Sequence, residues 1–362
     1  MSSHIPASGA EPQADQPGAK QPGSKLNLPA TAAGSIGPGG GVRALEPMDP
    51  QLKSIQPGGG QCMRLELAWG MFRRFILRTV FPGYVRRMQA CRQGQDANYP
   101  HPILDPRDLK FYQNRNGYYW LPQDDPFRWR DHLPFARAGL AELMLLGGTA
   151  AGLAIWTGLA GWWWLSIAPA IVAVLIFWFF RNPRRVAPPG EHLILSPADG
   201  KIVQILELDH HPFIQGPAVQ IGIFLSIFNV HINRVPMASR IIGMTYRKGK
   251  FLNALLPRSA QENEQLEVRM EQSAPPFRGL VVRQIAGAIA RRIVCWVKPG
   301  DQLLSGAQFG LIKFGSRTEL VFPREAGTVI LCRLGQNVQA GTTILAEYSS
   351  APVSPSSATM SG

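Results

Sequence analysis

Residues 138–180 form an almost unbroken apolar stretch, with a single acidic residue, Glu142, near its start. The stretch is about twice as long as the ~20 residues that cross a bilayer as one helix. A glycine-containing break near its middle is followed by three consecutive tryptophans. This pattern predicts two helices, 140–158 and 163–180, joined by a tight turn with aromatic residues at a membrane interface. A buried helical pair in a soluble core and a re-entrant hairpin are the alternatives.

Basic residues flank both outer ends of this predicted hairpin, and the connecting turn has none. They are Arg128, Arg130 and Arg137 before it and Arg181, Arg184 and Arg185 after it. The positive-inside rule therefore places both ends in the cytoplasm. We expect a protein of the cell membrane whose C-terminal domain lies on the cytoplasmic side.

A basic extension, residues 61–137, precedes the hairpin. Within it, residues 63–92 mix Leu, Trp, Phe and Ile with seven arginines. This composition predicts an amphipathic helix on anionic lipid head groups, although an ordinary solvated helix has the same pattern. The net charge of +13 would also suit nucleic acid. No nucleic-acid-binding signature accompanies it, so the expected partner is a membrane lipid and not nucleic acid.

The two ends of the chain lack the composition of a packed domain. Residues 1–60 are dominated by Gly, Pro, Ala, Ser and Gln, which predicts a disordered segment. It has no apolar signal-peptide core behind a basic start. Residues 349–362 have the composition of a loose tail. The four cysteines show neither paired nor metal-like spacing, so we expect free thiols, a reducing compartment and no metal.

Residues 181–348 are predicted to form a mainly β (α+β) domain, because short β-branched stretches alternate there with Gly, Pro and Asp. The predicted strands are 202–208, 219–227, 239–246, 279–287, 291–297, 309–314, 318–322, 328–333 and 343–348, with one helix near 259–266. Paired glycines, Gly300/Gly306 and Gly335/Gly341, each bracket an apolar residue. This repeat resembles the hairpin of biotinyl/lipoyl-type sandwich barrels. No lysine lies between the glycines, so we expect a sandwich-barrel-like scaffold and not a carrier.

A Gly-Ser bond, Gly315–Ser316, lies between two strand-like stretches near the C-terminus. In a strained turn, the Ser316 hydroxyl can attack the Gly315 carbonyl and convert the amide into an ester. Elimination across the Cα–Cβ bond of Ser316, then loss of ammonia, would leave a pyruvoyl group on the new chain. Gly-Ser is also one of the commonest turn dipeptides, so the bond alone does not indicate an enzyme.

Two other segments supply the groups that this chemistry needs. Asp199 lies in LSPADGKIVQI, before a strand, and His231 lies in LSIFNVHINRVP, at a strand end. Each has an ordinary explanation, since Asp-Gly is a hairpin turn signal and a lone buried His is commonly a core residue. Together they offer Ser316 a base, and they offer that base a carboxylate for its other ring N–H.

These three segments resemble those of the phosphatidylserine decarboxylases, pyruvoyl-dependent enzymes that make phosphatidylethanolamine. The resemblance covers about 180–348, and the hairpin with its Arg-Asn-Pro exit is similar to the shorter bacterial and archaeal forms. Residues 1–130 are not covered. The resemblance implies that the chain cuts itself before Ser316. It also implies that the small pyruvoyl-capped α chain stays with the larger β chain, and that Asp199 and His231 act with Ser316.

The resemblance also implies a reaction on a phospholipid substrate in the membrane. The substrate amine would form a Schiff base with the pyruvoyl group at position 316, which takes up the electrons as carbon dioxide leaves, and His231 would supply a proton. Candidates to hold the lipid phosphate or carboxylate are Arg234, Lys248, Lys250 and Arg317. Two of these depart from the family pattern. Arg317 follows the cut where many members have Thr, and Arg234 stands where some have a second His.

Two other functions are compatible with parts of the sequence. A non-enzymatic, membrane-anchored barrel adaptor would leave the chain uncut and the three segments unexplained. A pyruvoyl decarboxylase acting on a soluble amino acid would not need the hairpin. The oligomeric state is left open.

Overall fold

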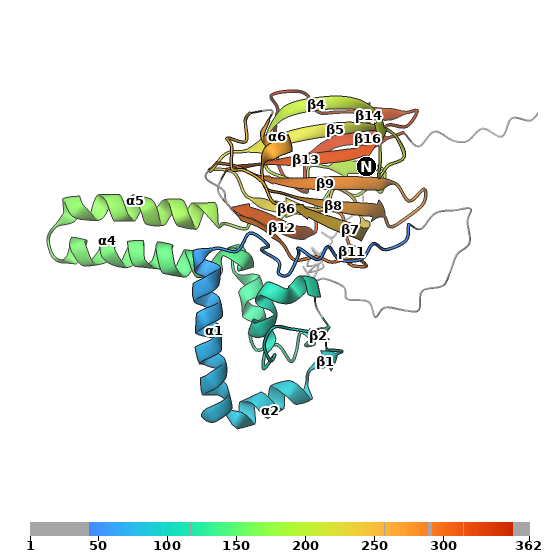
Figure 1. The fold of residues 1–362 in the computed structure, drawn as a ribbon. Coiled ribbons are helices and arrows are strands. Elements are labelled where there is room, and N and C mark those ends of the chain that lie inside the picture. The colour runs from blue at the N-terminus through green and yellow to red at the C-terminus, as the bar shows by residue number, and fades with distance from the viewer. Residues whose placement is uncertain are drawn as a thin grey trace, which may run out of the picture.

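The computed structural model describes residues 43–349, apart from 97, 116, 257, 289–291 and 314. Three parts follow one another along the chain: an N-terminal helical part, a two-helix projection and a large β domain (Figure 1). The β-rich class predicted from the sequence is confirmed. Most of the predicted disordered segment, residues 1–42, and the tail from 350 onward lie outside the described residues.

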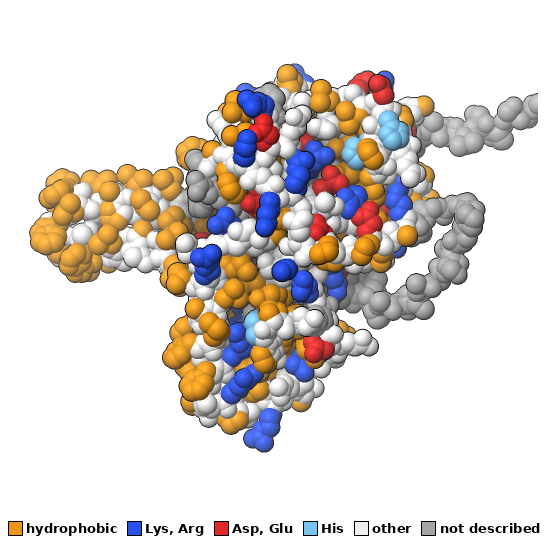
Figure 2. Space-filling model, in the orientation of Figure 1, with side chains coloured by type: hydrophobic (Ala, Val, Ile, Leu, Met, Phe, Trp, Pro, Cys, Tyr) orange, Lys and Arg blue, Asp and Glu red, His pale blue; other side chains and the backbone are white. Residues whose placement is uncertain are grey.

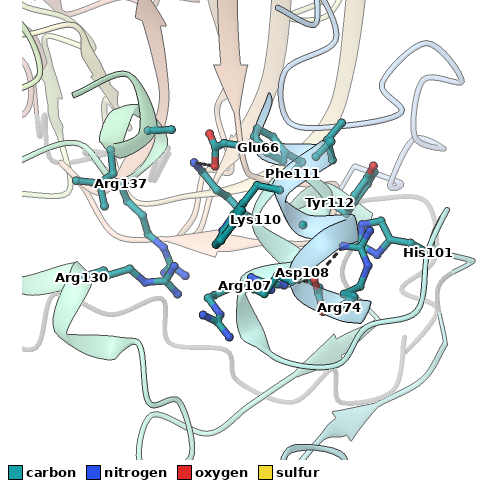
Figure 3. A pocket seen from close by; sticks show the side chains of 16 residues that line it. Glu66, Arg74, His101, Arg107, Asp108, Lys110, Phe111, Tyr112, Arg130 and Arg137 are labelled. Atoms are coloured by element: carbon teal, nitrogen blue, oxygen red, sulfur yellow. Dashed lines mark hydrogen bonds and ion pairs between the residues drawn. The ribbon is translucent and has the colours of Figure 1, made fainter. Parts of the chain in front are cut away.

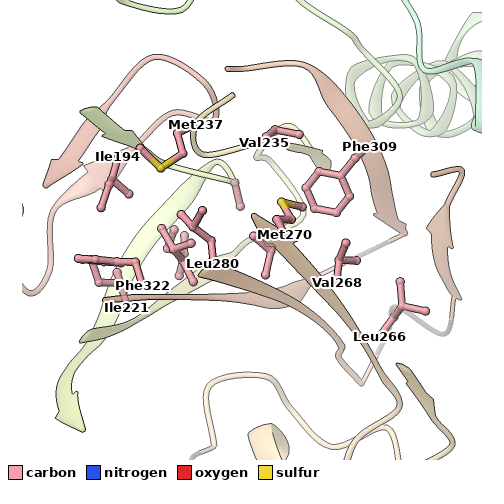
Figure 4. Packing of buried hydrophobic residues seen from close by; sticks show 14 of the residues in the cluster. Ile194, Ile221, Val235, Met237, Leu266, Val268, Met270, Leu280, Phe309 and Phe322 are labelled. Atoms are coloured by element: carbon pink, nitrogen blue, oxygen red, sulfur yellow. The ribbon is translucent and has the colours of Figure 1, made fainter. Parts of the chain in front are cut away.

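One eight-stranded antiparallel sheet forms the base of the β domain. Its strands, in spatial order, are β11 (Gln302–Leu303), β7 (Ser239–Arg247), β8 (Gln265–Gln272), β9 (Gly279–Ala286), β13 (Ser316–Pro323), β5 (Gly216–Leu225), β4 (Gly200–His211) and β15 (Asn337–Val338). Their alternating apolar residues face one core, where Ile221, Val268 and Phe322 lie among the buried side chains (Figure 4). Strand β13 is flanked on both sides, by β9 and β5, so its first residue is firmly positioned.

Two three-stranded sheets complete the domain. They are β10 (Arg292–Cys295), β12 (Gln308–Lys313) and β6 (Ile232–Arg234), and β14 (Thr328–Ile330), β16 (Ile344–Tyr348) and β3 (Leu193–Leu195). Phe309 from the first and Ile194 from the second are fully buried in the same core as the large sheet. Strands β12 and β13 are consecutive in sequence but belong to different sheets. The chain therefore changes sheets at the predicted cleavage site.

The two glycine repeats occupy opposite edges of the large sheet. The first contains β11 and the second contains β15. Gly306 and Gly341 have positive φ angles of 74° and 72° and lie against each other, since a Cβ on Gly341 would be 3.2 Å from the Gly306 Cα. The repeats thus meet in space. Closure into a barrel and the biotinyl-type hairpin stay predictions.

Strand β8 corrects the predicted helix at 259–266. The helix there, α6 (Ser259–Glu262), has a single turn, and β8 begins three residues later. In β8, Leu266, Val268 and Met270 are fully buried and alternate with charged residues, which is the period of a strand. The charged positions concealed this alternation in the sequence. The short strands β3, β6, β11 and β15 were also not predicted.

The basic extension folds as several short elements. They are α1 (Gln61–Thr79), α2 (Pro82–Ala90), β1 (Gln93–Gly94), η1 (Pro106–Arg115), β2 (Tyr118–Tyr119) and η2 (Arg128–His132). The single helix expected at 63–92 is broken, because Pro82 cannot continue α1 and instead begins α2. Trp69, Phe72 and Phe75 on α1 are each more than half exposed, so this helix keeps an unburied apolar surface.

Residues 43–60 correct the boundary of the predicted disordered segment, because they pack on the β domain. Leu52 and Ile55 are buried, and the Glu46 N–H bonds the Ile242 carbonyl at 2.9 Å. The Asp49 carboxylate accepts the Tyr246 N–H at 2.8 Å. Apolar anchors and contacts of this kind order a segment whose overall composition is that of a disordered chain.

The predicted helical hairpin is present as a projection from the β domain (Figure 1). Its first helix combines η3 (Arg137–Gly139), α3 (Leu140–Glu142), η4 (Leu143–Gly148) and α4 (Thr149–Leu159), and its second is α5 (Trp163–Phe179). Within the described residues, the helix Arg137–Leu159 is long and apolar enough to cross a membrane, and α5 is shorter. Hydrophobic side chains cover the visible face of the projection (Figure 2).

Candidate active site

The Gly315–Ser316 bond lies at the corner between the two sheets. Gly315 has φ +60°, in the region that favours glycine, and Ser316 begins β13 opposite Leu225 of β5 and Ala286 of β9. Ser316 is fully buried. Its Oγ has no hydrogen-bond partner among the described residues, which is an unfavourable state for a buried hydroxyl. A nucleophile without a partner therefore lies directly beside the bond that it is predicted to cut.

His231 contacts the same corner through its ring. Its Nε2 accepts a hydrogen bond from the Gly315 N–H at 3.2 Å, and its Nδ1 donates to the Asn229 carbonyl at 2.9 Å. Burial lowers the pKa of His231 to about 4, and the Phe179 ring lies 4.4 Å away, centroid to centroid. The imidazole is therefore neutral near pH 7, with its basic nitrogen facing the predicted cleavage site.

A short loop between β5 and β6 holds His231 and ties it to the hairpin. The Asn229 side-chain oxygen accepts hydrogen bonds from the Ser226 N–H and hydroxyl, at 2.8 and 2.7 Å. The Phe228 carbonyl accepts from the Trp178 indole at 3.2 Å and from the Arg181 guanidinium at 2.8 Å. Because Trp178 and Arg181 lie at the end of α5, the candidate site is located at the foot of the hairpin.

Gly287 packs directly against the bond to be cut. A Cβ built on Gly287 would overlap the carbonyl oxygen of Gly315 and would lie 3.4 Å from the Ala254 side chain. The carbonyl carbon that Ser316 would attack belongs to this group. A glycine is therefore required after β9 for the carbonyl to occupy its place.

Asp199 lies close to the site but does not bond His231, which differs from the arrangement expected from the sequence. Its carboxylate binds the Arg185 guanidinium through both oxygens, one of them at 2.7 Å, and accepts the Ala340 N–H at 2.8 Å. The Asn229 carbonyl takes the place predicted for Asp199 at the ring. The charge of Asp199 still raises the pKa of His231, against the larger effect of burial.

The four predicted substrate-binding residues are dispersed. Arg234 is buried and donates to the carbonyls of Gly306 (2.9 Å) and Pro183 (3.3 Å), and burial lowers its pKa to about 10. Arg317 is buried against Glu319 at 2.8 Å and also bonds Gln204. Lys248 is exposed, and Lys250 is exposed and pairs with Glu262 at 2.8 Å. In the uncut chain both arginines have protein partners already.

A buried amide pair near Ser316 was not predicted from the sequence. Asn233 donates to the Thr318 hydroxyl at 3.0 Å and accepts from the Gln284 amide at 2.8 Å. Both amides are fully buried, and they link β6, β13 and β9. An amide inside an apolar strand was the available signal. For Phe179 and Asn229 only the fold reveals their place beside His231.

The chain is similar to known proteins over the region that contains this candidate site. A family model described as phosphatidylserine decarboxylase matches residues 172–346, which include Asp199, His231 and Ser316. A phosphatidylserine decarboxylase proenzyme of Rhodopirellula baltica is 50% identical over 244 residues, 66% of this chain and 99% of the relative. Proenzymes of the same name are 42% identical over 185 residues in Syntrophus aciditrophicus (51% of this chain, 85% of the relative) and 39% over 236 in Paramagnetospirillum magneticum (64% and 90%).

Proposed function

The chain belongs to the phosphatidylserine decarboxylase family, and on this premise we propose that it converts phosphatidylserine to phosphatidylethanolamine with a pyruvoyl group made from Ser316. The observation that carries the proposal is the buried Ser316 Oγ, which has no partner among the described residues and lies in the same corner as a neutral His231. A non-enzymatic adaptor would have no use for either group.

The first event is cleavage of the chain by its own residues. The Ser316 hydroxyl attacks the Gly315 carbonyl carbon, and His231 Nε2 is the base closest to this bond in the described contacts. The bond from the Ser316 nitrogen to Gly315 breaks as an ester forms, and elimination then releases the residue 1–315 chain with Gly315 as its carboxylate. Water then replaces the nitrogen left on residue 316, which departs as ammonia and leaves a ketone. A fixed geometry of this kind corresponds to effective molarities of about 10⁵–10⁸ M, so no second enzyme is needed.

The residues present fit a pyruvoyl group, and the word proenzyme in the names of the relatives suggests that the chain is processed. Ser316 contributes all of its carbon atoms, and a pyruvoyl ketone takes up the electrons released when an amino acid loses carbon dioxide. Around it, the large sheet holds position 316 between β9 and β5. His231 lies within reach to deliver a proton, and Asp199, neutralised by Arg185, fixes the neighbouring turn. The two product chains stay associated because β12 and β13 are embedded in one core.

The position of the site suits a substrate that remains in the bilayer. Phe179, the last residue of α5, packs on His231, so the reaction would take place where the hairpin leaves the membrane. We propose that the hairpin inserts in the cell membrane, with the β domain at the cytoplasmic face, since basic residues flank only its outer ends. Arg234, Lys248, Lys250 and Arg317 stay candidates for the lipid head group.

Intact-mass analysis of wild type beside Ser316→Ala tests the proposal. Wild type is expected to give a 316–362 fragment with an amine-free, carbonyl-reactive N-terminus, and to release carbon dioxide from phosphatidylserine in mixed micelles. Ser316→Ala is expected to stay whole and inactive. A wild-type chain that stays whole in membranes and in detergent would refute the pyruvoyl mechanism.

A further inference from the structure

A cavity lined by several charged side chains lies in the basic extension, away from the residues assigned to the reaction. It is formed by α1, η1, η2 and the start of the hairpin, and its volume is about 270 Å³. Neither His231 nor Ser316 lines it. Six cationic side chains do: Arg73, Arg74, Arg107, Lys110, Arg130 and Arg137.

Carboxylates neutralise only part of this charge. The ion pairs are Arg73 and Arg74 with Asp108 (Arg74 at 3.1 Å), Arg107 with Asp105 (2.5 Å), Lys110 with Glu66 (2.5 Å) and Arg137 with Asp131 (2.9 Å). Six cations against these four carboxylates leave two positive charges. One of them lies on α1, where Arg73 and Arg74 share Asp108, and the other lies at η2, because among the described residues Arg130 has no carboxylate within 4.0 Å.

Arg130 is held in place without an ionic partner. Its guanidinium lies 4.8 Å from the centre of the Phe127 ring, and that of Arg107 lies 4.1 Å from the same ring. The Arg130 Nη2 and the Arg137 Nε are both buried with no hydrogen-bond partner among the described residues. Figure 3 shows the side chains of Arg107, Arg130 and Arg137 directed toward a common space. Burial, followed by the charge of Arg137, lowers the pKa of Arg130 to about 10.

Such a group of guanidinium ions is unfavourable until an anion joins it. Like charges repel one another, and partly buried N–H donors without acceptors lose their hydration. Guanidinium groups match phosphate oxygens with paired, charge-assisted hydrogen bonds, so a phosphate satisfies the free donors and the excess charge together.

The surroundings of the cavity favour a lipid as the source of the phosphate. Arg137 is the first residue of the helix long enough to cross a membrane. Trp69 lines the cavity and is 62% exposed, and Phe72 and Phe75 on the same helix are also exposed. Aromatic residues beside arginines at the end of an apolar helix are typical of the head-group level of a bilayer. We propose that this cavity binds the phosphate group of an anionic phospholipid, as a site separate from the one at Ser316.

Two variants on one helix test the proposal. Arg130→Gln removes the unpaired guanidinium from the cavity, whereas Arg128→Gln removes an exposed charge two residues away that does not line it. Binding of dihexanoyl phosphatidylglycerol, which has no serine to decarboxylate, is measured by calorimetry on the full chain in dodecyl maltoside. Arg130→Gln is expected to weaken binding at least tenfold, and Arg128→Gln less than twofold. Arg137→Gln is the second cavity variant, and unfolding midpoints confirm that all three variants are folded.

Inorganic phosphate is the competitor that identifies the source. The lipid assignment predicts that phosphate at the same concentration displaces little of the phosphatidylglycerol. If inorganic phosphate at the same concentration displaces the phosphatidylglycerol, the lipid assignment is overturned in favour of a soluble phosphate. Equal binding by wild type and by both folded cavity variants, or equal loss in Arg128→Gln and Arg130→Gln, would overturn the site itself.

Discussion

His231 accepts the backbone N–H of Gly315 on its Nε2 at 3.2 Å, while its Nδ1 donates to a carbonyl two residues upstream. This pair of contacts fixes the tautomer, since only one ring nitrogen carries a proton. The unprotonated nitrogen faces the predicted cleavage site, and burial lowers the pKa of the ring so that it stays unprotonated at neutral pH. We propose that this nitrogen releases the Gly315 N–H and accepts the proton of the Ser316 hydroxyl when the chain is cut.

Replacing His231 by Asn removes this base with little change in volume. We expect cleavage before Ser316 to slow by about 10²–10⁴-fold, the usual contribution of a general base. Mass spectrometry at intervals after synthesis measures it, and His210→Gln, an exposed histidine on β4, is the matched control. Decarboxylation by any cut His231→Asn chain is measured separately. Cutting at the wild-type rate would exclude His231 as the base for cleavage.

The same burial predicts a pH dependence of stability. His231 has a pKa of about 4 in the folded chain and about 6.5 when unfolded, so acid favours the unfolded state. The contribution of the neutral ring to the free energy of unfolding is complete above pH 6.5. It declines as the pH falls toward 4, by about 2 kcal/mol between pH 7 and pH 5. Unfolding of Ser316→Ala is compared with Ser316→Ala/His231→Asn, both uncut. Between pH 7 and pH 5 the free energy of unfolding of the double variant should fall by about 2 kcal/mol less than that of Ser316→Ala. An equal fall in the two variants would contradict the buried neutral ring.

Asp199 is predicted to act through Arg185 and not through the ring. Asp199→Asn leaves Arg185 buried without its carboxylate, so we expect slower cleavage and a lower unfolding midpoint. Adding Arg185→Met removes the unpaired charge and should restore much of both. If Asp199 instead relays a proton through His231, the second substitution would leave the cleavage rate low.

The sequence was sufficient to predict candidate reacting residues but not the way they are arranged. Asp199, His231 and Ser316 each lie in a distinctive segment, and the fold brings these segments to one region. The partner of the imidazole is a backbone carbonyl, that of Asn229, and carbonyls have no sequence signature. The carboxylate was assigned to the ring because a side chain was the only partner that the sequence displayed.

The hairpin and most strands were predictable because their periodicity is strong, whereas strand β8 was not. Its charged residues Glu267 and Arg269 pair with each other at 2.8 Å on the solvent face, so a polar sequence still forms an inner strand of the sheet. Residues 43–60 were assigned to a disordered segment because their order depends on two buried anchors, Leu52 and Ile55, and not on composition.

Gly287→Ala is predicted to block maturation by displacing the bond to be cut. The added methyl group would occupy the position of the Gly315 carbonyl oxygen, and a shift of about 1 Å costs roughly 100-fold in a positioned reaction. Gly216→Ala at the start of β5 is the control, because a Cβ there meets nothing within 4 Å. Circular dichroism confirms the fold of each, and mass spectrometry gives the fraction cut. Normal cutting of a folded Gly287→Ala chain would show that this contact does not position the carbonyl.

A buried ion pair between Glu142 and Lys313 joins the first hairpin helix to β12, two residues before Gly315. The Lys313 ammonium also donates to the Gln56 side chain at 3.2 Å, and both charged side chains are at most 10% exposed. Removing one partner of such a pair leaves the other charge buried, at a cost of about 3–5 kcal/mol. We therefore expect Glu142→Gln and Lys313→Met each to lower the unfolding midpoint in detergent and to slow cleavage, because β12 then loses its fixed position.

The double variant Glu142→Gln/Lys313→Met distinguishes this pair from two independent contacts. It should be more stable than either single variant, since no unpaired charge is left. A double-mutant cycle on the exposed pair Lys250–Glu262 is the matched control. It should show little coupling free energy, because solvent screens this pair. If cleavage recovers together with stability in the double variant, the pair positions the loop between β12 and β13 only through its charges. Recovered stability with slow cleavage would show that the hairpin must hold Lys313 itself for the Gly315–Ser316 bond to reach its reactive geometry.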